Sequence, residues 1–465
     1  MGKVLQVIIA LVSIKILTEV LSTEEVGNYY LLLTILMFFN FTFLNPLGQY
    51  YGRYLIAWET SKNLLTATNT LILLRVFIIF VSLIFGYGIF EYFGYSKYYS
   101  LFDFLLFVFI ALVAGTHGVL ISVVNTLGDR IKFIKYLVMT LLLSLVLSLV
   151  FVYFFDKSAM SWLYGIAVAQ LFFTVFVYKY LSKNNHFSLF KMKSILNKEY
   201  VKKVSYFIIP ITLTLFLQWG QNISYRFIIE LKYSIEVLAF IAVGLSISGA
   251  IFSAVEGLAT QYFNPIYLKK ITNAMEKKRA EAWNEVASMI LPIYLLLMLF
   301  VMSLSPYLTK VLVAEKFHEA YIYVLLGAMI EFFRVSTNIV YLVSQSELKT
   351  NSTILPYTVG FVISIVTLYL VDFSNDLWLI PLVLTVAYMS IFLILFISMK
   401  KLLAITIDLI SLAKALLIAV PFGVAYFLDT DYSMFITLLI VFVMGLYFLL
   451  GVYMLSLKKQ KEMVS

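Results

Sequence analysis

The feature of this sequence that most limits its fold is a succession of long apolar stretches separated by short polar breaks. Each stretch is close to the roughly 20 residues that a helix needs to cross the hydrocarbon core of a bilayer. A mean hydropathy of +0.97, with 62% hydrophobic and 13% charged residues, lies outside the range of soluble globular domains. The chain is therefore expected to be an integral membrane protein.

Helices are the expected form of these stretches. Strands of a membrane β-barrel alternate apolar and polar residues over about ten positions, whereas these runs are longer and uniformly apolar. Lipid admits only helices and closed barrels, so we predict an all-α membrane protein with about 14 transmembrane helices. The predicted spans are residues 4–21, 28–50, 68–90, 103–126, 136–155, 161–181, 204–229, 236–262, 284–308, 320–344, 354–371, 377–398, 412–428 and 433–456.

The charges between the spans predict the orientation of the chain. Basic clusters such as 191–203 and 269–279 follow even-numbered spans, whereas acidic turns such as Glu24 and Glu25 follow odd-numbered ones. Lys and Arg concentrate in cytoplasmic loops, so both termini are expected in the cytoplasm. The net charge of +9 then reflects orientation and contact with anionic lipid headgroups, and nothing indicates nucleic acid.

A weak internal repeat predicts two lobes. At an offset of 211 residues, Lys15 aligns with Arg226 and Glu19 with Glu230, and both segments are a span, a short acidic turn and a returning span. Parallel repeats in transporters are related by an axis along the membrane normal. We predict two pseudo-symmetric six-helix lobes around a central cavity, plus two C-terminal helices. The expected units are residues 1–181 (N-lobe), 182–203 (linker), 204–398 (C-lobe) and 399–465 (spans 13 and 14 and a cytoplasmic tail).

The linker is expected to be an amphipathic helix on the cytoplasmic surface. Leu189, Met192, Leu196 and Tyr200 recur at helical spacing with lysines between them, as in helices that lie in a membrane interface. A disordered basic linker is the alternative, because short isolated helices are only marginally stable.

Two segments near the start carry a family resemblance. The turn LSTEEVGNYYLLLTI and the following FLNPLGQYYGRYL resemble the start of the Wzx-like O-antigen and polysaccharide flippases. That family belongs to a superfamily that also contains multidrug exporters and lipid-linked peptidoglycan precursor flippases. The likeness extends over the whole chain in length, span number and layout, whereas the local motif is short.

The resemblance implies a function in surface polysaccharide biosynthesis. The cargo would be an undecaprenyl-diphosphate-linked oligosaccharide, moved from the cytoplasmic to the periplasmic leaflet of the bacterial inner membrane by alternating access. Membrane lipids and other polysaccharide assembly proteins would be its partners, the protein would be a monomer, and no cofactor is expected. Transport would be passive or coupled to Na⁺ or H⁺.

Cations inside the spans are the candidate substrate-binding residues. Ionisable groups in a membrane interior are costly and usually mark function, and a cation lowers the barrier for a lipid diphosphate. The repeat makes Lys15 and Arg226 a matched pair that would face each other across the pseudo-axis. The four candidates are Lys15, Arg226, Arg334 and Arg75.

Each cation also has a structural interpretation. Lys15 and Arg226 are each followed four residues later by a glutamate, so Lys15–Glu19 and Arg226–Glu230 ion pairs are alternatives. Arg334 follows Glu331 by three residues and can form an internal salt bridge. Arg75 can extend its side chain to the inner surface instead of meeting a headgroup.

Two further residues are candidates for ion coupling. Glu256 lies in span 8, and a glutamate there can alternate between protonated and paired states. His117 lies in span 4 and titrates near neutral pH, although a single histidine more often only forms packing hydrogen bonds.

An enzyme is not expected. The sequence has no G-x-x-x-x-G-K-[ST] phosphate loop, no H-E-x-x-H metal motif and no nucleophile elbow, and no metal site is predicted. A cation-coupled multidrug exporter is the alternative function. A membrane polysaccharide polymerase is less favoured, because the loops on the outer side are short.

Overall fold

The structure is a computed structural model that describes all residues except 1, 184–197, 273, 348, 431 and 465. Every regular element in its described part is a helix. The helices of the first half are α1 (Gly2–Val20), α2 (Thr23–Phe39), the π-helix η1 (Asn40–Leu44), α3 (Asn45–Thr60), α4 (Leu64–Tyr92), the 3₁₀ helix η2 (Tyr95–Lys97), α5 (Leu101–Ala114), α6 (Thr116–Thr126), α7 (Arg130–Phe154) and α8 (Ala159–Ser182).

The second half continues in the same way. Its helices are α10 (Lys198–Asn222), α11 (Tyr225–Lys232), α12 (Ile235–Ile271), α13 (Glu276–Leu312), the 3₁₀ helix η3 (Glu315–Ala320), α14 (Tyr321–Ser346), η4 (Thr350–Thr353), α15 (Ile354–Leu370), α16 (Leu379–Lys400), α17 (Leu409–Ala419), η5 (Val420–Phe427) and α18 (Met434–Val464).

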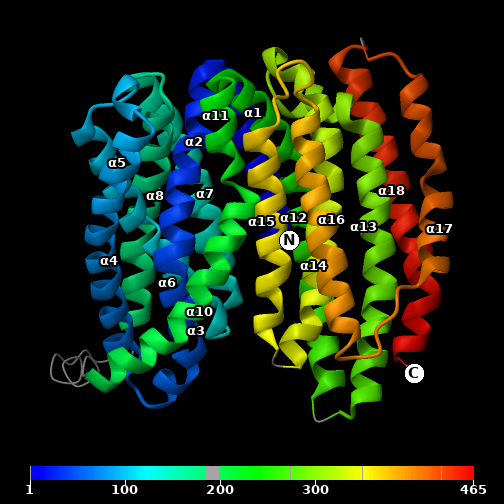
Figure 1. Cartoon of the computed structure of the whole chain (residues 1–465), viewed down its shortest axis with the longest axis horizontal. Coiled ribbons are helices and arrows are strands. Elements are labelled where there is room, and N and C mark those ends of the chain that lie inside the picture. The colour runs from blue at the N-terminus through cyan, green and yellow to red at the C-terminus, as the bar shows by residue number, and fades with distance from the viewer. Residues whose placement is uncertain (1, 184–197, 273, 348, 431, 465) are drawn as a thin grey trace.

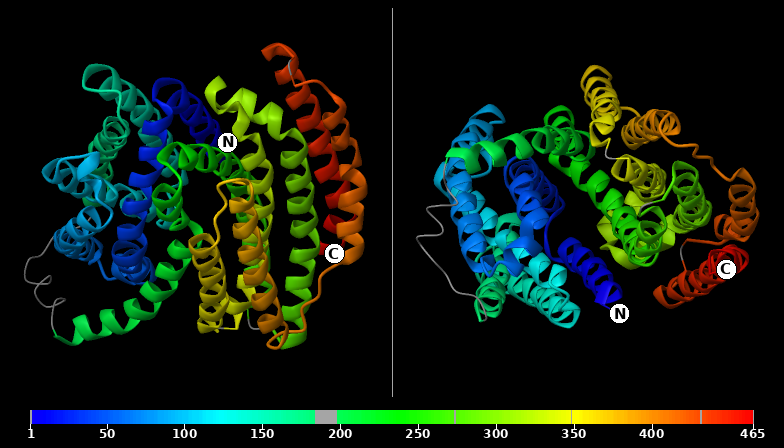
Figure 2. Two further views of the ribbon diagram at one scale, coloured as in Figure 1. Left: turned by 45° about the horizontal axis from the view of Figure 1, so that its top comes forward. Right: turned by 90° about the horizontal axis from the view of Figure 1, so that it is seen from below.

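Two groups of helices stand side by side (Figures 1 and 2). We call α2–α8, coloured blue to teal, the first lobe, and α11–α16, coloured green to orange, the second lobe. Helices α17 and α18 pack on α13 at the far side of the second lobe. We call the end at which α2 begins the upper end and the end at which α13 begins the lower end, as in Figure 1. The expected fold class, an all-α membrane bundle, is confirmed.

Span number and boundaries differ in part from the sequence prediction. Within the described residues, twelve helical segments are long and apolar enough to cross a membrane. The two other predicted spans correspond to α1, which carries Lys15 and Glu19, and to the α10–α11 pair, which is interrupted between Asn222 and Tyr225. The predicted linker helix falls mostly on residues 184–197, outside the described residues, and its last residues begin α10.

The acidic turn after the first span is shorter than predicted. Glu24 and Glu25 lie in the first turn of α2, and the Ser22 side chain caps that helix by accepting a hydrogen bond from the backbone N–H of Glu25 at 3.2 Å. Carboxylates are favourable at a helix N-terminus because they complement the helix dipole. The two glutamates therefore start the second span instead of lying in a loop.

Helices α1 and α10 lie between the lobes. Helix α1 packs on α7 of the first lobe and on α12 of the second. In α10, the ring of Phe207 lies 5.5 Å from that of Tyr50 on α3, whereas Gln221 near the other end accepts a hydrogen bond from Ser364 of α15 at 3.1 Å. Each of these helices therefore contacts both lobes.

Close packing inside the first lobe depends on Gly165. A Cβ atom at this position would overlap the backbone of Ser148, where α7 crosses α8. We expect Gly165→Ala to lower the free energy of unfolding by about 1–3 kcal/mol, the usual cost of overpacking. Thermal unfolding in detergent would measure this. Gly445→Ala in α18 is the matched control, because no atom lies within 4 Å of its added Cβ, and an equal loss in both variants would contradict the prediction.

Candidate functional site

A cavity of about 420 Å³ lies between the lobes, and we call it the central cavity. It is lined by α1, α2, α7 and α8 on one side and by α11 and α12 on the other. Its lining is mainly apolar, with hydroxyl groups of serine, threonine and tyrosine. The polar lining residues are Ser13, Tyr29, Tyr30, Thr140, Ser144, Ser148, Gln170, Arg226 and Ser246.

A smaller cavity of about 230 Å³ lies inside the second lobe, and we call it the second-lobe cavity. Helices α11, α12, α14 and α16 contribute to it, together with the end of α10. Two residues, Arg226 and Ser246, line both cavities. The charged and polar lining residues are Gln221, Asn222, Tyr225, Arg226, Ser246, Glu331, Arg334 and Tyr388.

Arg226 is the cation at the junction of the two cavities. Its Nη1 donates to the backbone oxygen of Tyr30 at 3.3 Å and to Oγ1 of Thr34 at 3.5 Å, both on α2. Its guanidinium lies 5.1 Å from the centre of the Tyr30 ring, a cation–π contact. Its Nε is buried and has no hydrogen-bond partner. No acidic partner of Arg226 is found among the described residues, so its charge is free to meet an anion.

The alternative Arg226–Glu230 ion pair is wrong. Glu230, whose side chain is 1% exposed, pairs instead with Lys97 of η2 at 2.8 Å. This contact joins the lobes at their upper end, and the hydrogen bond to Glu230 raises the pKa of Lys97. This pair could not be predicted from local sequence, because its two members are 133 residues apart.

Lys15 does not line the central cavity, although its neighbours Ser13, Ile14 and Leu17 do. Its Nζ donates to the backbone oxygen of Val313 at 2.5 Å and pairs with Glu19 at 3.0 Å. The expected Lys15–Glu19 ion pair is thus present, and Lys15 and Arg226 are not brought together at the cavity.

Lys15 and Arg226 are not brought together because the repeat is shifted by one residue from the predicted alignment. The N-cap of α12 is Ser234, as Ser22 is of α2. Aligning these two caps gives an offset of 212 residues in place of 211, and Arg226 then corresponds to Ile14, which lines the cavity. A shift of one residue turns a side chain by about 100° around a helix. Lys15, the predicted partner of Arg226, therefore does not line the central cavity.

Arg334 is held between two carboxylates. Its Nε donates to Glu331 at 2.7 Å and its Nη2 to Glu256 at 2.9 Å, while Asn338 donates to the other oxygen of Glu256 at 2.6 Å. The predicted Glu331–Arg334 salt bridge is confirmed. The same geometry assigns Glu256 to this cluster, whose formal charge is −1 with both carboxylates ionised.

Arg75 is buried inside the first lobe, with 1% of its surface exposed. Its Nε donates to Oγ1 of Thr116 at 3.4 Å, and its Nη1 has no partner. Extension to the inner surface is therefore wrong for Arg75. Arg75 does not line either of the cavities described above.

His117 lies directly behind the wall of the central cavity. Its Nε2 is 3.1 Å from Oγ1 of Thr140, a cavity-lining residue, and its Nδ1 has no partner. The contact with Thr140 is a hydrogen bond of the kind expected if His117 only packs between helices. Among the described residues, no group of three or more His, Cys, Asp or Glu side chains is arranged to hold a metal ion.

Further contacts in the upper halves join the lobes to each other and to the two helices between them. The Tyr30 hydroxyl bonds that of Ser246 at 2.8 Å, the Trp219 indole donates to the Thr34 backbone oxygen at 3.2 Å, and the backbone N–H of Ala314 donates to Thr18 at 3.0 Å. These hydroxyl and indole groups were not predicted. Serine and threonine are common in membrane helices, so their positions in the sequence carried no signal.

The structure resembles solved transporters over almost its full length. The lipid II flippase MurJ, in an inward closed conformation, matches with a TM-score of 0.69 and 13% identity, over 100% of this chain and 98% of the other. An inward-facing multidrug resistance MATE family transporter of the MOP superfamily matches with a TM-score of 0.64 and 11% identity, over 87% and 94%. The fold is that of the MOP superfamily transporters.

The structure of a eukaryotic MATE transporter also matches this chain, with a TM-score of 0.55 and 12% identity, over 89% of this chain and 94% of the other. No family model matches the sequence, and the search of curated proteins found no match. The solved proteins named above are transporters and a flippase. At these identities the comparison establishes the MOP fold, while the cargo has to be argued from the cavity.

Proposed function

We propose that this protein is a flippase that moves an undecaprenyl-diphosphate-linked oligosaccharide from the cytoplasmic to the periplasmic leaflet for surface polysaccharide biosynthesis. The observation that carries the proposal is Arg226, a cation without an acidic partner among the described residues, at the junction of the two cavities. A diphosphate is the part of such a cargo that crosses a membrane interior at greatest cost. A guanidinium matches phosphate oxygens in charge and geometry.

Two further features fit a transporter that loads its cargo from the cytoplasmic side. The basic loops predict that the lower end faces the cytoplasm, and the contacts between the lobes lie in their upper halves. This is the arrangement expected of a conformation that loads cargo from the cytoplasmic side and later opens the upper end. Lys15 and Arg75 remain proposed contacts for a headgroup in other conformations of the cycle.

A cation-coupled multidrug exporter is the second candidate, and the cluster of Glu256, Glu331 and Arg334 favours it. Two carboxylates around one arginine can take up Na⁺ or H⁺ when the arginine contact loosens. In the flippase the same cluster would couple cargo movement to an ion, with His117 as a further candidate for proton uptake.

Deletion of the gene separates the two functions. A flippase predicts that undecaprenyl-linked oligosaccharide accumulates on the cytoplasmic leaflet and that surface polysaccharide is lost, which lipid extraction and surface staining would measure. The wild-type gene supplied in trans should restore export. Unchanged polysaccharide together with lost drug resistance would overturn the proposal and favour the exporter.

A further inference from the structure

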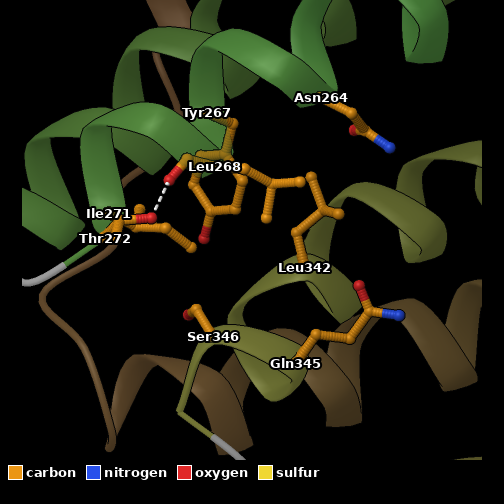
Figure 3. A pocket seen from close by; sticks show the side chains of 8 residues that line it. All are labelled: Asn264, Tyr267, Leu268, Ile271, Thr272, Leu342, Gln345 and Ser346. Carbon is orange, nitrogen blue, oxygen red and sulfur yellow. Dashed lines mark hydrogen bonds between the residues drawn. The ribbon is translucent and has the colours of Figure 1, made fainter. Parts of the chain in front are cut away.

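A third cavity, of about 300 Å³, lies at the lower end of the second lobe (Figure 3), and we call it the lower pocket. It lies between the last turns of α12 and α14. Its size falls at the low end of the range for small-molecule sites. The lining residues are Asn264, Tyr267, Leu268, Ile271, Thr272, Leu342, Gln345 and Ser346.

The lining of the lower pocket combines polar and apolar side chains and contains no charged one. Two amides, Asn264 and Gln345, and the hydroxyls of Thr272 and Ser346 are among its lining groups. Tyr267 is 2% exposed, and its hydroxyl points toward the side chain of Ser346 (Figure 3). Amide and hydroxyl groups in such a lining can both donate and accept hydrogen bonds, so they suit a ligand that offers both donors and acceptors.

One pair of opposite charges beside the pocket, Arg279 and Glu347, is neutralised. Arg279 donates from Nε and Nη2 to the two oxygens of Glu347, at 2.8 and 2.9 Å. This bidentate pair leaves both side chains occupied, and neither lines the pocket. An anionic phosphate therefore finds no cation in the lining, whereas a neutral hydroxyl-rich ligand meets both donors and acceptors.

A row of polar side chains links the lower pocket to the second-lobe cavity. Glu331, Asn338 and Gln345 follow one another at intervals of seven residues on α14, and that spacing keeps them on one face of the helix. Glu331 lines the second-lobe cavity, Gln345 lines the lower pocket, and Asn338 between them bonds Glu256 of α12. The lower pocket is thus the lower end of a polar seam between α12 and α14 that leads to Arg226.

We propose that the lower pocket is a carbohydrate subsite that binds one or two neutral sugar residues of the cargo before the diphosphate reaches Arg226. This inference rests on the proposed function. Amide and hydroxyl groups provide the paired donors and acceptors that sugar hydroxyls require, and Leu268, Ile271 and Leu342 provide apolar surface for the faces of a sugar ring.

A cysteine-protection experiment tests the subsite, because the chain contains no cysteine. The variants Ser346→Cys, in the lower pocket, and Ser246→Cys, at the junction of the other two cavities, are purified as full-length protein. Each is labelled with a small maleimide in the presence of undecaprenyl diphosphate carrying a neutral oligosaccharide, or of undecaprenyl diphosphate alone. We expect the oligosaccharide lipid to slow labelling of both cysteines, and the bare diphosphate to slow only that at position 246.

Amide replacements provide a second measurement. Asn264→Leu with Gln345→Leu should weaken binding of the oligosaccharide lipid by about tenfold, the loss expected for two hydrogen bonds, and leave binding of undecaprenyl diphosphate unchanged. Asn351→Leu, an exposed amide of η4, is the matched control and should change neither affinity.

The outcomes distinguish a failure of the carbohydrate subsite from a failure of the proposed flippase function. Protection of Cys at position 246 by both lipids, with equal or no protection at position 346, would overturn the carbohydrate subsite and leave the flippase proposal standing. If neither lipid protects either position, the proposed function fails and the subsite fails with it. An equal loss of affinity for both lipids in the double amide variant would show a structural effect and would also overturn the subsite.

Discussion

Replacing Arg226 by glutamine is expected to lower transport of the lipid-linked oligosaccharide by roughly 10- to 100-fold. A hydrogen bond to a charged group contributes about 1.5–3 kcal/mol, and each 1.4 kcal/mol corresponds to a factor of about ten. Because Arg226 has no acidic partner among the described residues, its removal leaves no unpaired carboxylate behind. The protein should therefore stay folded in the membrane. Flipping of a fluorescent cargo in proteoliposomes, at equal protein content, would measure the effect.

Two variants make this result specific. Arg226→Lys keeps the charge and loses the planar fork of donors, so we expect an intermediate rate. Arg53→Gln removes an exposed arginine on α3, outside both cavities, and should flip cargo at the normal rate. Normal transport by Arg226→Gln would remove Arg226 from the mechanism.

Replacing Arg334 by methionine is expected to destabilise the protein by about 3–5 kcal/mol, the usual cost of breaking a buried ion pair. The change leaves Glu256 and Glu331, with side chains 20% and 14% exposed, close to each other without their common cation. Thermal unfolding in detergent and the amount of protein in the membrane would both report the loss.

A neutral version of the cluster is the control for this effect. Glu256→Gln and Glu331→Gln combined with Arg334→Met remove all three charges together, and most of the stability should return, because replacing a complete buried ion cluster is often nearly neutral. If the triple variant is as unstable as Arg334→Met, packing of the arginine stem and not charge accounts for the loss.

The membrane class and most span positions could be predicted because both depend on local hydropathy. The cluster of Glu256, Glu331 and Arg334 could be predicted from the sequence only in part. Glu331 and Arg334 are three residues apart on one helix, so their contact follows from helical spacing. Glu256 joins them from α12, 78 residues earlier than Arg334, and that contact depends on how α12 packs against α14.

The position of Lys15 outside the central cavity has a different physical reason. Sequence similarity between the two halves is too weak to define the repeat within one residue, and an error of one residue rotates a helical side chain by about 100°. Only the capping serines, Ser22 and Ser234, define the register. The lower pocket was missed because its amides and hydroxyls are ordinary residues at the ends of two helices.

Helix α10 has a consequence for how the lobes can move. From Phe207, which contacts the first lobe, to Gln221, which contacts the second, the helix rises about 20 Å, and its length changes little under load. A stiff helix that contacts both lobes allows them to rotate relative to each other about its ends, but it resists translation of one lobe past the other along the bilayer normal. Pro210 lies between the two contacts and removes one backbone hydrogen bond within α10. We expect α10 to bend at this residue when the lobes rotate relative to each other.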